Sequence, residues 1–181
     1  MIAFWRHGYE GVSMAYLTEL TGLQASSLYA AFGSKRELFD LAVDSYGEAF
    51  GRYVEQALDE QPTAYLAIEE FLREAAKAQT LPGLPHGCLI IQGASNVPPK
   101  SAEVAEGLTR RRNMTVTLLH ERISADVSAG RLPAETDARG LAEYYVSVQQ
   151  GMAQRAKDGA TREALEAIAE LAMRSWPVAA R

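Results

Sequence analysis

Four residues that form hydrogen bonds through uncharged side chains stand close together near the start of this chain. Gln24, Ser26, Ser27 and Tyr29 carry one amide and three hydroxyl groups within six positions. Gln24 and Ser26 are of the types that bind the edges of nucleic-acid bases, whereas Ser27 and Tyr29 are of the types that bind phosphate oxygens. The chemistry that this group offers is recognition through hydrogen bonds.

Ser13 and Lys35 extend this group on either side. Each is expected at the N-terminus of a helix, where backbone N–H groups also point outward and attract anions. We therefore expect both side chains to contact phosphates, which fix the register of a protein on DNA without reading its sequence. The alternative is that Ser13 and Ser34 are only helix caps and that Tyr29 packs against the neighbouring helix.

Two short helices joined by a tight turn would position these side chains. Ser13 is suited to cap the first helix, Gly22 to form the turn, and Leu23 to bury itself between the two helices. The expected apolar face of the first helix consists of Met14, Leu17 and Leu20.

The second helix is predicted over residues 26–32, with Leu28 and Phe32 facing inward because they lie four positions apart. The polar residues at or near its N-terminal end then face solvent. This is the arrangement of a helix-turn-helix, whose second helix enters the major groove of DNA. Ala30 and Ala31 cannot form hydrogen bonds through their side chains, so few residues would read the sequence.

Residues 4–39 also follow a spacing that is typical of one protein family. The matching positions are Phe4, Gly8-Tyr9, Val12-Ser13, Gly22-Leu23, Ser27-Leu28-Tyr29, Phe32, Ser34-Lys35 and Leu38-Phe39. The pattern resembles the N-terminal signature of TetR/AcrR-type transcriptional regulators. This resemblance implies an all-α fold, with a helix-turn-helix DNA-binding domain in residues 1–46 and a ligand-binding and dimerisation domain in residues 47–181.

The resemblance also implies a mechanism and a set of partners. A homodimer would place its two second helices roughly 34 to 36 Å apart, in the half-sites of a near-palindromic double-stranded operator. A small-molecule effector, bound among the middle helices, would change this separation and release the DNA, so that the protein acts as a repressor. No cofactor is implied, and the expected location is the cytoplasm.

The charge of the chain shows that any DNA binding must be focused. The net charge is −5, and residues 1–53 hold four cationic and six acidic side chains, a net charge of −2. A protein that holds DNA by bulk electrostatics needs a broad basic surface instead. Only Met1 to His7 precede the Gly8-Tyr9 corner, where relatives usually carry a fuller first helix, so we expect either a truncated start or a modest affinity.

Helical periodicity continues through the remainder of the chain, and no apolar run is long enough for a signal peptide or a membrane span. The one β-like run, residues 88–91, is too short and isolated to form a sheet. The expected elements are one long linking helix over 35–57, a helix after Pro62, a short apolar segment at 88–95, and helices over about 101–129, 136–158 and 162–176.

The last two helices carry more apolar surface than one small bundle easily covers. Their expected apolar faces are Leu141, Tyr144, Tyr145, Val148 and Met152, and Leu165, Ile168, Ala169, Leu171, Ala172 and Trp176. A second copy of the chain, paired through helices 136–158 and 162–176, is the simplest cover. The alternative is a core formed within one chain.

An effector cavity among the middle helices would be lined by mixed apolar, amide and phenol side chains. The candidates are Phe71, His86, Cys88, Gln92, Asn96, Met114, Tyr144, Tyr145, Gln149 and Met152. Such a lining suits a largely hydrophobic molecule with one or two polar atoms. The alternative for each residue is a place in the core.

Other chemistry has less support in the sequence. Cys88 and His86 are the types of a thiol nucleophile and its base, but residues two apart on a helix do not face each other, so no enzyme is expected. No metal site is expected, because His7 and His120 lack ligand spacing to these two residues.

The basic run from Arg110 to Arg112 has two interpretations. It is either a solvated surface paired with Glu103 and Glu106, or part of a site for an anionic effector. For the whole chain, a ligand-responsive DNA-binding regulator is predicted. The alternative from another class is a small-molecule-binding helical dimer that has lost DNA binding.

Overall fold

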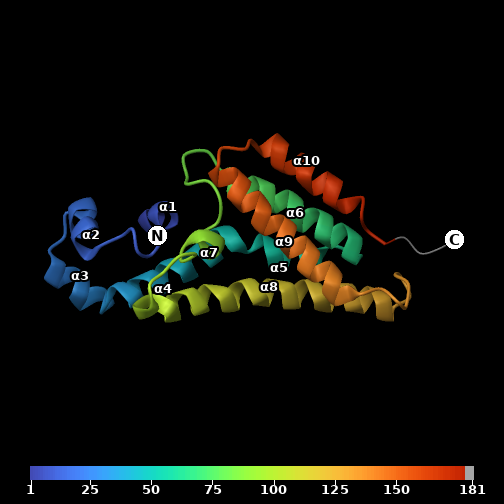
Figure 1. Cartoon of the computed structure of the whole chain (residues 1–181), viewed down its shortest axis with the longest axis horizontal. Coiled ribbons are helices and arrows are strands. Elements are labelled where there is room, and N and C mark those ends of the chain that lie inside the picture. The colour runs from blue at the N-terminus through green and yellow to red at the C-terminus, as the bar shows by residue number, and fades with distance from the viewer. Residues whose placement is uncertain (178–181) are drawn as a thin grey trace.

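The computed structural model describes residues 1–177, and no strand occurs among them, so the predicted all-α fold is confirmed. The helices are α1 (Ile2–His7), α2 (Met14–Thr21), α3 (Ala25–Phe32), α4 (Lys35–Tyr46), α5 (Tyr53–Glu60), α6 (Ala64–Gln79), α7 (Leu89–Gln92), α8 (Ala102–Ser128), α9 (Ala138–Lys157) and α10 (Arg162–Met173). Figure 1 shows an elongated molecule with α1, α2 and α3 at one end. The long helix α8 runs from α4 to the opposite end of the molecule.

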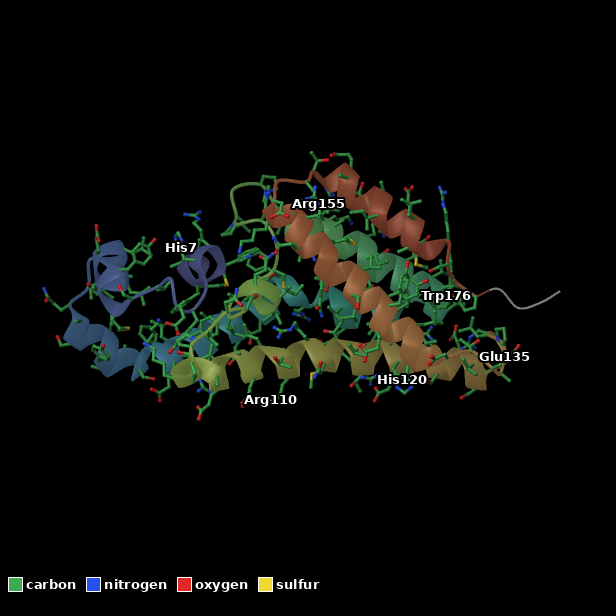
Figure 2. The ribbon with its side chains drawn as sticks, viewed as in Figure 1. His7, Arg110, His120, Glu135, Arg155 and Trp176 are labelled. Carbon is green, nitrogen blue, oxygen red and sulfur yellow. The ribbon has the colours of Figure 1, made fainter. Side chains whose placement is uncertain are left out.

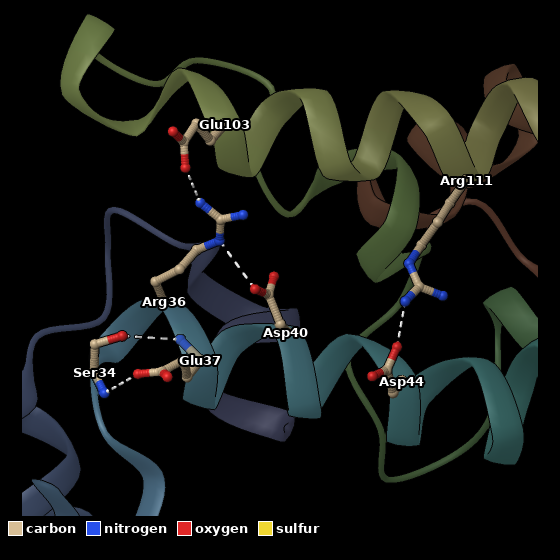
Figure 3. Close-up of polar contacts among 7 residues, drawn as sticks. All are labelled: Ser34, Arg36, Glu37, Asp40, Asp44, Glu103 and Arg111. Atoms are coloured by element: carbon tan, nitrogen blue, oxygen red, sulfur yellow. Dashed lines mark hydrogen bonds and ion pairs between the residues drawn. The ribbon is translucent and has the colours of Figure 1, made fainter.

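Local signals in the sequence form the helix-turn-helix. The Ser13 hydroxyl caps α2 by accepting a hydrogen bond from the Tyr16 N–H at 3.0 Å. Gly22 ends the helix with φ 69°, in the left-handed region that costs glycine little. At the start of α4, Ser34 and Glu37 form a reciprocal capping box (Figure 3). The predicted cap at Ser13 and turn at Gly22 are therefore confirmed.

The predicted burial of two leucines in this module is wrong. Leu20 is 60% exposed and Leu23 is 50% exposed, whereas Leu17 and Leu28 are buried. Because α1 has only six residues and α2 and α3 only eight each, the small module has no element that covers the end of α2 and the turn. Leu17 and Leu28 supply the buried contacts of its two helices with the core, and the partly buried Met14, Tyr16 and Phe32 pack against the same cluster.

An aromatic core joins the helix-turn-helix to the second domain. The Phe4 and Phe39 rings meet edge to face at 5.1 Å, and Trp5 meets Tyr46 at 4.8 Å. The same cluster continues into Leu89 of α7. At the Gly8-Tyr9 corner, the Tyr9 N–H donates a hydrogen bond to the Gly93 carbonyl at 2.7 Å. The N-terminal end of the molecule is thus packed directly on α7.

The predicted single linking helix over 35–57 is interrupted. A π-helical turn, Gly47–Gly51, separates α4 from α5, and none of its residues is buried. The two glycines at its ends weaken the α-helical preference locally, and π turns are often found at functional sites. The linking segment therefore has a built-in irregularity at the border of the two domains.

The core of the second domain centres on α6, which packs against α5, α9 and α10 (Figure 1). Phe71 of α6 and Tyr145 and Met152 of α9 are fully buried within this one chain. Part of the two predicted apolar faces is therefore covered within one chain, where α9 packs on α6 and α8, and α10 packs on α6 and α9. The last helix also ends at Met173 rather than 176.

Candidate DNA-binding surface and effector cavity

The helix α3 presents its predicted hydrogen-bonding residues to solvent. Leu28 is buried and fixes the rotation of the helix, so that Ser26, Ser27 and Tyr29 are exposed. Gln24 occupies the N-cap position but its side chain makes no capping bond, which leaves the amide free for a base edge. Tyr29 is half exposed and does not pack fully against its neighbours. The arrangement suits insertion of α3 into a groove, and the role of each residue stays a prediction.

The two flanking residues differ in their surroundings. Ser13 is exposed at the N-terminus of α2, while its hydroxyl serves as the helix cap. The Lys35 ammonium lies 4.1 Å from the centre of the Tyr9 ring, in a cation–π contact. Partial burial lowers the pKa of Lys35 below its ordinary value. Contact of Lys35 with a phosphate would therefore compete with its position over Tyr9.

A cavity of about 810 Å³ lies where the linking segment meets α7, α8 and α9. We call it the main cavity. One wall is the π turn and its neighbours, including Tyr46, Phe50 and Tyr53, and another is the face of α8 that carries Arg111 and Arg112. A volume of this order is typical of sites for small organic molecules.

The ten residues predicted for an effector site do not come together in one place. Cys88, Met114 and Gln149 line the main cavity. Phe71, Tyr145 and Met152 are core residues, while Tyr144 and His86 are exposed. Gln92 and Asn96 border a separate hollow of about 330 Å³ near α1, and the Gln92 amide donates to the Ala153 carbonyl at 3.0 Å.

Sequence reasoning missed several polar residues of the main cavity. The Gln149 amide donates to the Tyr53 hydroxyl at 3.0 Å, and the Gln79 amide donates to the Gln149 carbonyl at 3.3 Å. Burial raises the pKa of Tyr53 and of Tyr46, with Cys88 adding to both shifts, so the two hydroxyls stay protonated. Tyr46, Tyr53 and Gln79 occupy helix faces that read as ordinary core, so no signal in the sequence distinguishes them.

The predicted cysteine and histidine do not form a catalytic pair. Cys88 is buried, and burial raises the pKa of its thiol, which disfavours a nucleophilic thiolate. His86 is exposed on the loop before it. Within residues 1–177 no three acidic, histidine or cysteine side chains form a metal-binding group, and His7 and His120 lie far apart in Figure 2.

The basic run of α8 divides into three environments. Figure 2 shows Arg110 pointing away from the rest of the molecule. Arg111 forms an ion pair with Asp44 of α4 (Figure 3), and Arg112 is half-buried at the main cavity. The predicted pairing of this run with Glu103 is wrong, because Glu103 binds Arg36 of α4 at 2.6 Å. α4 runs alongside the first part of α8, so that Arg36 lies opposite Glu103 and Asp44 lies opposite Arg111 (Figure 3).

An exposed second helix on a helix-turn-helix, followed by an all-helical domain with a cavity, defines a class of DNA-binding regulators. The chain matches the family model "Bacterial regulatory proteins, tetR family" over residues 1–42 and the model "Tetracyclin repressor-like, C-terminal domain" over residues 66–172. It therefore belongs to the tetR family, and it is a DNA-binding transcriptional regulator rather than an enzyme.

Named relatives agree with this assignment. The HTH-type transcriptional repressor ComR of Escherichia coli (strain K12) is 33% identical, over 98% of this chain and 85% of that protein. A solved structure of a cysteine mutant of the TetR family regulator CifR with 26-bp operator DNA is 40% identical, with a TM-score of 0.93 over 97% of this chain and 92% of that one. A regulator from Rhodococcus sp. RHA1, described as a TetR transcriptional regulator, is 38% identical, with a TM-score of 0.68 over 97% and 94%.

One further property of the helices concerns membranes. None of the helices within residues 1–177 combines the length and the apolar character needed to cross a bilayer.

Proposed function

We propose that this protein represses transcription as a homodimer that binds a near-palindromic operator and is released when a small effector occupies the main cavity. In this proposal residues 1–46 read the DNA, and residues 47–181 bind the effector and form the dimer. The observation that carries the proposal is the position of the main cavity, which lies directly against the π turn between these two parts. A regulator of genes works where the DNA is, which supports a cytoplasmic location.

Contacts across the π turn give the effector a route to the DNA-binding end. Tyr46 and Phe50 line the main cavity, and both also pack on Trp5 of α1, at ring distances of 4.8 and 5.2 Å. A ligand that displaces these two rings must therefore disturb the packing of α1. Because the core is close-packed, such a displacement moves whole elements rather than single side chains.

Part of the surface of α9 and α10 supports the dimer. Tyr144 is 42% exposed and Leu171 is 59% exposed, although both are large and apolar. Leu141 and Ile168, which are partly buried, extend the same surface. These residues form the part of the two predicted apolar faces that is not covered within the chain. A second copy of the chain would remove this surface from water.

How strongly an effector can release the DNA depends on the difference between its affinities for two conformations of the protein. An effector weakens DNA binding only to the extent that it prefers the conformation that does not fit the operator, and each 1.4 kcal/mol or so of preference changes the affinity about tenfold. The chain resembles, at a TM-score of 0.93, solved structures of CifR mutants complexed with operator DNA, which supports the interpretation that the structure described here is near the DNA-binding conformation.

A mobility-shift titration against a fragment that contains the protein's own promoter tests the proposal. We expect a sequence-selective shift that weakens steeply between low and moderate salt, since phosphate contacts release counterions. A fragment of equal length with both half-sites scrambled is the control. No selective shift at low salt would favour the alternative, a ligand-binding dimer without DNA binding.

A further inference from the structure

Arg112 is a charged residue without a counter-ion at the wall of the main cavity. Its guanidinium donates hydrogen bonds to the Ile90 carbonyl at 2.8 Å and to the Thr109 hydroxyl at 2.9 Å, and no carboxylate pairs with it among residues 1–177. Burial lowers the pKa of Arg112, which means that its charge is partly stripped of water. An anion from outside the chain would restore the missing interaction.

The other charged residues around the main cavity do not fill this role. The exposed charged residues at its rim are Asp44, Glu48, Arg52, Glu55 and Arg111. Among the described residues that line the main cavity, Arg112 is the single charged one that is not exposed. Asp44 is already neutralised by its ion pair with Arg111. The inner part of the main cavity therefore carries uncompensated positive charge.

A second polar group in the main cavity also lacks a partner. Gln79 is 2% exposed, and its Oε1 atom accepts no hydrogen bond from any described residue. A buried acceptor without a donor is costly, and such groups in native proteins usually have an explanation. Because this atom is closed off from solvent, a ligand O–H or N–H group satisfies it only after the Gln79 side chain turns toward the main cavity.

We propose that the main cavity binds a small organic carboxylate, whose charged end pairs with Arg112 and whose apolar body lies against Ile91, Leu118 and Val146. A hydroxyl or amide group on the body bonds to Gln79 once this side chain turns toward the main cavity. This inference deepens the proposed function and rests on it, because it names the chemical class of the effector.

The same carboxylate has a direct route to the DNA-binding domain. Arg111 also lines the main cavity, but its guanidinium is held by Asp44 of α4 (Figure 3). A carboxylate beside Arg112 competes with Asp44 for Arg111 and so removes one of the ion pairs that tie α4 to α8. The pair of Arg36 and Glu103, nearer the start of α8, then remains as the other tie.

Calorimetric titration with two matched probes tests the ligand class. Octanoate and octanamide share the same flexible chain, which adapts to the shape of the cavity, and differ in charge. We expect saturable binding of octanoate, at least about tenfold tighter than that of octanamide, since a hydrogen bond to a charged group is stronger than one to a neutral group. Equal binding of both probes, or no binding of octanoate, would overturn the proposal.

Matched variants test whether the carboxylate binds at Arg112. Arg112→Gln should weaken octanoate binding about tenfold or more, whereas Arg112→Lys, which keeps the charge, should restore most of it. Arg110→Gln removes an equal charge from the outer face of α8 and should leave binding unchanged (Figure 2). The two glutamine variants losing binding equally would contradict a specific site.

Operator binding separates this inference from the proposed function. Octanoate should weaken the operator shift of the wild-type protein and not that of Arg112→Gln. Arg111→Gln alone should weaken it by at most about fivefold, because exposed ion pairs contribute little. A normal shift that octanoate leaves unchanged would overturn the inference alone, whereas a missing shift with intact octanoate binding would count against the proposed function alone.

Discussion

At the scale of single residues, one buried leucine determines which side chains of α3 face outward. Leu28 holds the inner side of α3, and the outer side then carries Ser26, Ser27 and Tyr29, followed by two alanines that offer no hydrogen bonds. We therefore expect that few residues of α3 read bases. Gln24, at the N-terminal end of the helix, has the most versatile side chain for this purpose, since an amide both donates and accepts.

The division between reading bases and gripping phosphates is testable with two variants. Tyr29→Ala should weaken binding to all DNA sequences alike, because a phosphate contact carries no sequence information. Gln24→Ala should cost about 1–3 kcal/mol on the preferred operator and relax discrimination at one base position. Mobility shifts on an operator library with single base changes measure both effects. The same pattern of loss for both variants would refute the division.

Asp126 contributes to the stability of the fold. Its buried carboxylate accepts hydrogen bonds from the Ala64 N–H at 2.7 Å, from Arg122 at 2.6 Å and from Arg131 at 2.8 Å, and so joins α8 to the start of α6. Burial alone would raise the pKa of Asp126, but the hydrogen bonds from Arg131, Ala64 and Arg122 outweigh it and hold the pKa below the ordinary value.

Asp126→Asn should lower the free energy of unfolding at pH 7 by about 3 kcal/mol, because it leaves two guanidinium groups without their charge partner. The lowered pKa means that this stabilisation is fully present above the pKa of the unfolded state, about 3.9, and is lost as the pH falls through the folded value. Urea unfolding across this range measures the difference between variant and wild type, which should shrink in acid.

Asp158→Asn serves as the control for this measurement. Asp158 pairs with Arg155 at the end of α9, but both side chains are about half exposed, and such pairs are worth little. We expect its stability to match that of the wild type within about 0.5 kcal/mol at every pH. A loss equal to that of Asp126→Asn would show that burial of the carboxylate is not what matters.

At the scale of elements, the π turn is where the structure departs most from the expected linking helix. Gly47 has φ −57° and ψ −45°, and a Cβ atom there would meet no other atom within 4 Å. Gly22 has equally open surroundings, but its φ is 69°. The two glycines thus differ in backbone conformation and not in available space.

Substitution by alanine should therefore act in opposite directions at these two sites. Gly47→Ala should stabilise the protein by about 0.4–1 kcal/mol, since it restricts the unfolded chain at a compatible site. Gly22→Ala should destabilise it by about 1 kcal/mol, the cost of a left-handed conformation for an L-residue. Thermal unfolding of both variants measures this, and a stabilised Gly22→Ala would contradict the stated geometry.

Elements marked by local signals could be predicted from the sequence, and those that depend on distant contacts could not. Ser13 and Gly22 act on their own neighbours, so the cap and the turn were evident. The main cavity depends on how α8 and α9 cross the linking segment, and no periodicity within one helix contains that information. The sequence therefore left Arg112 in a basic run that is either solvated surface or part of a site for an anionic effector, and nothing in it marked Gln79.

At the scale of the whole molecule, an acidic chain must bind a polyanion. A net charge of −5 gives no general attraction to DNA, so we expect the affinity to come from a few contacts, which the proposed homodimer uses twice. In the proposed homodimer, two copies of α3 held at a fixed spacing would double those contacts without a basic surface. This links operator affinity to the strength of the subunit contact, which makes the dimer surface the feature with the largest expected effect.

Leu171→Glu tests that link because it places a charge in the exposed apolar surface of α9 and α10, where burial of an unpaired carboxylate is costly. We expect sedimentation to show a monomer in place of the wild-type dimer, and operator affinity to fall about tenfold or more, since each half-site then binds alone. Leu20→Glu, at an equally exposed leucine on α2, should leave the dimer intact. If Leu171→Glu sediments as a dimer, the subunits pair through another surface, and the expected spacing of the two α3 helices no longer follows.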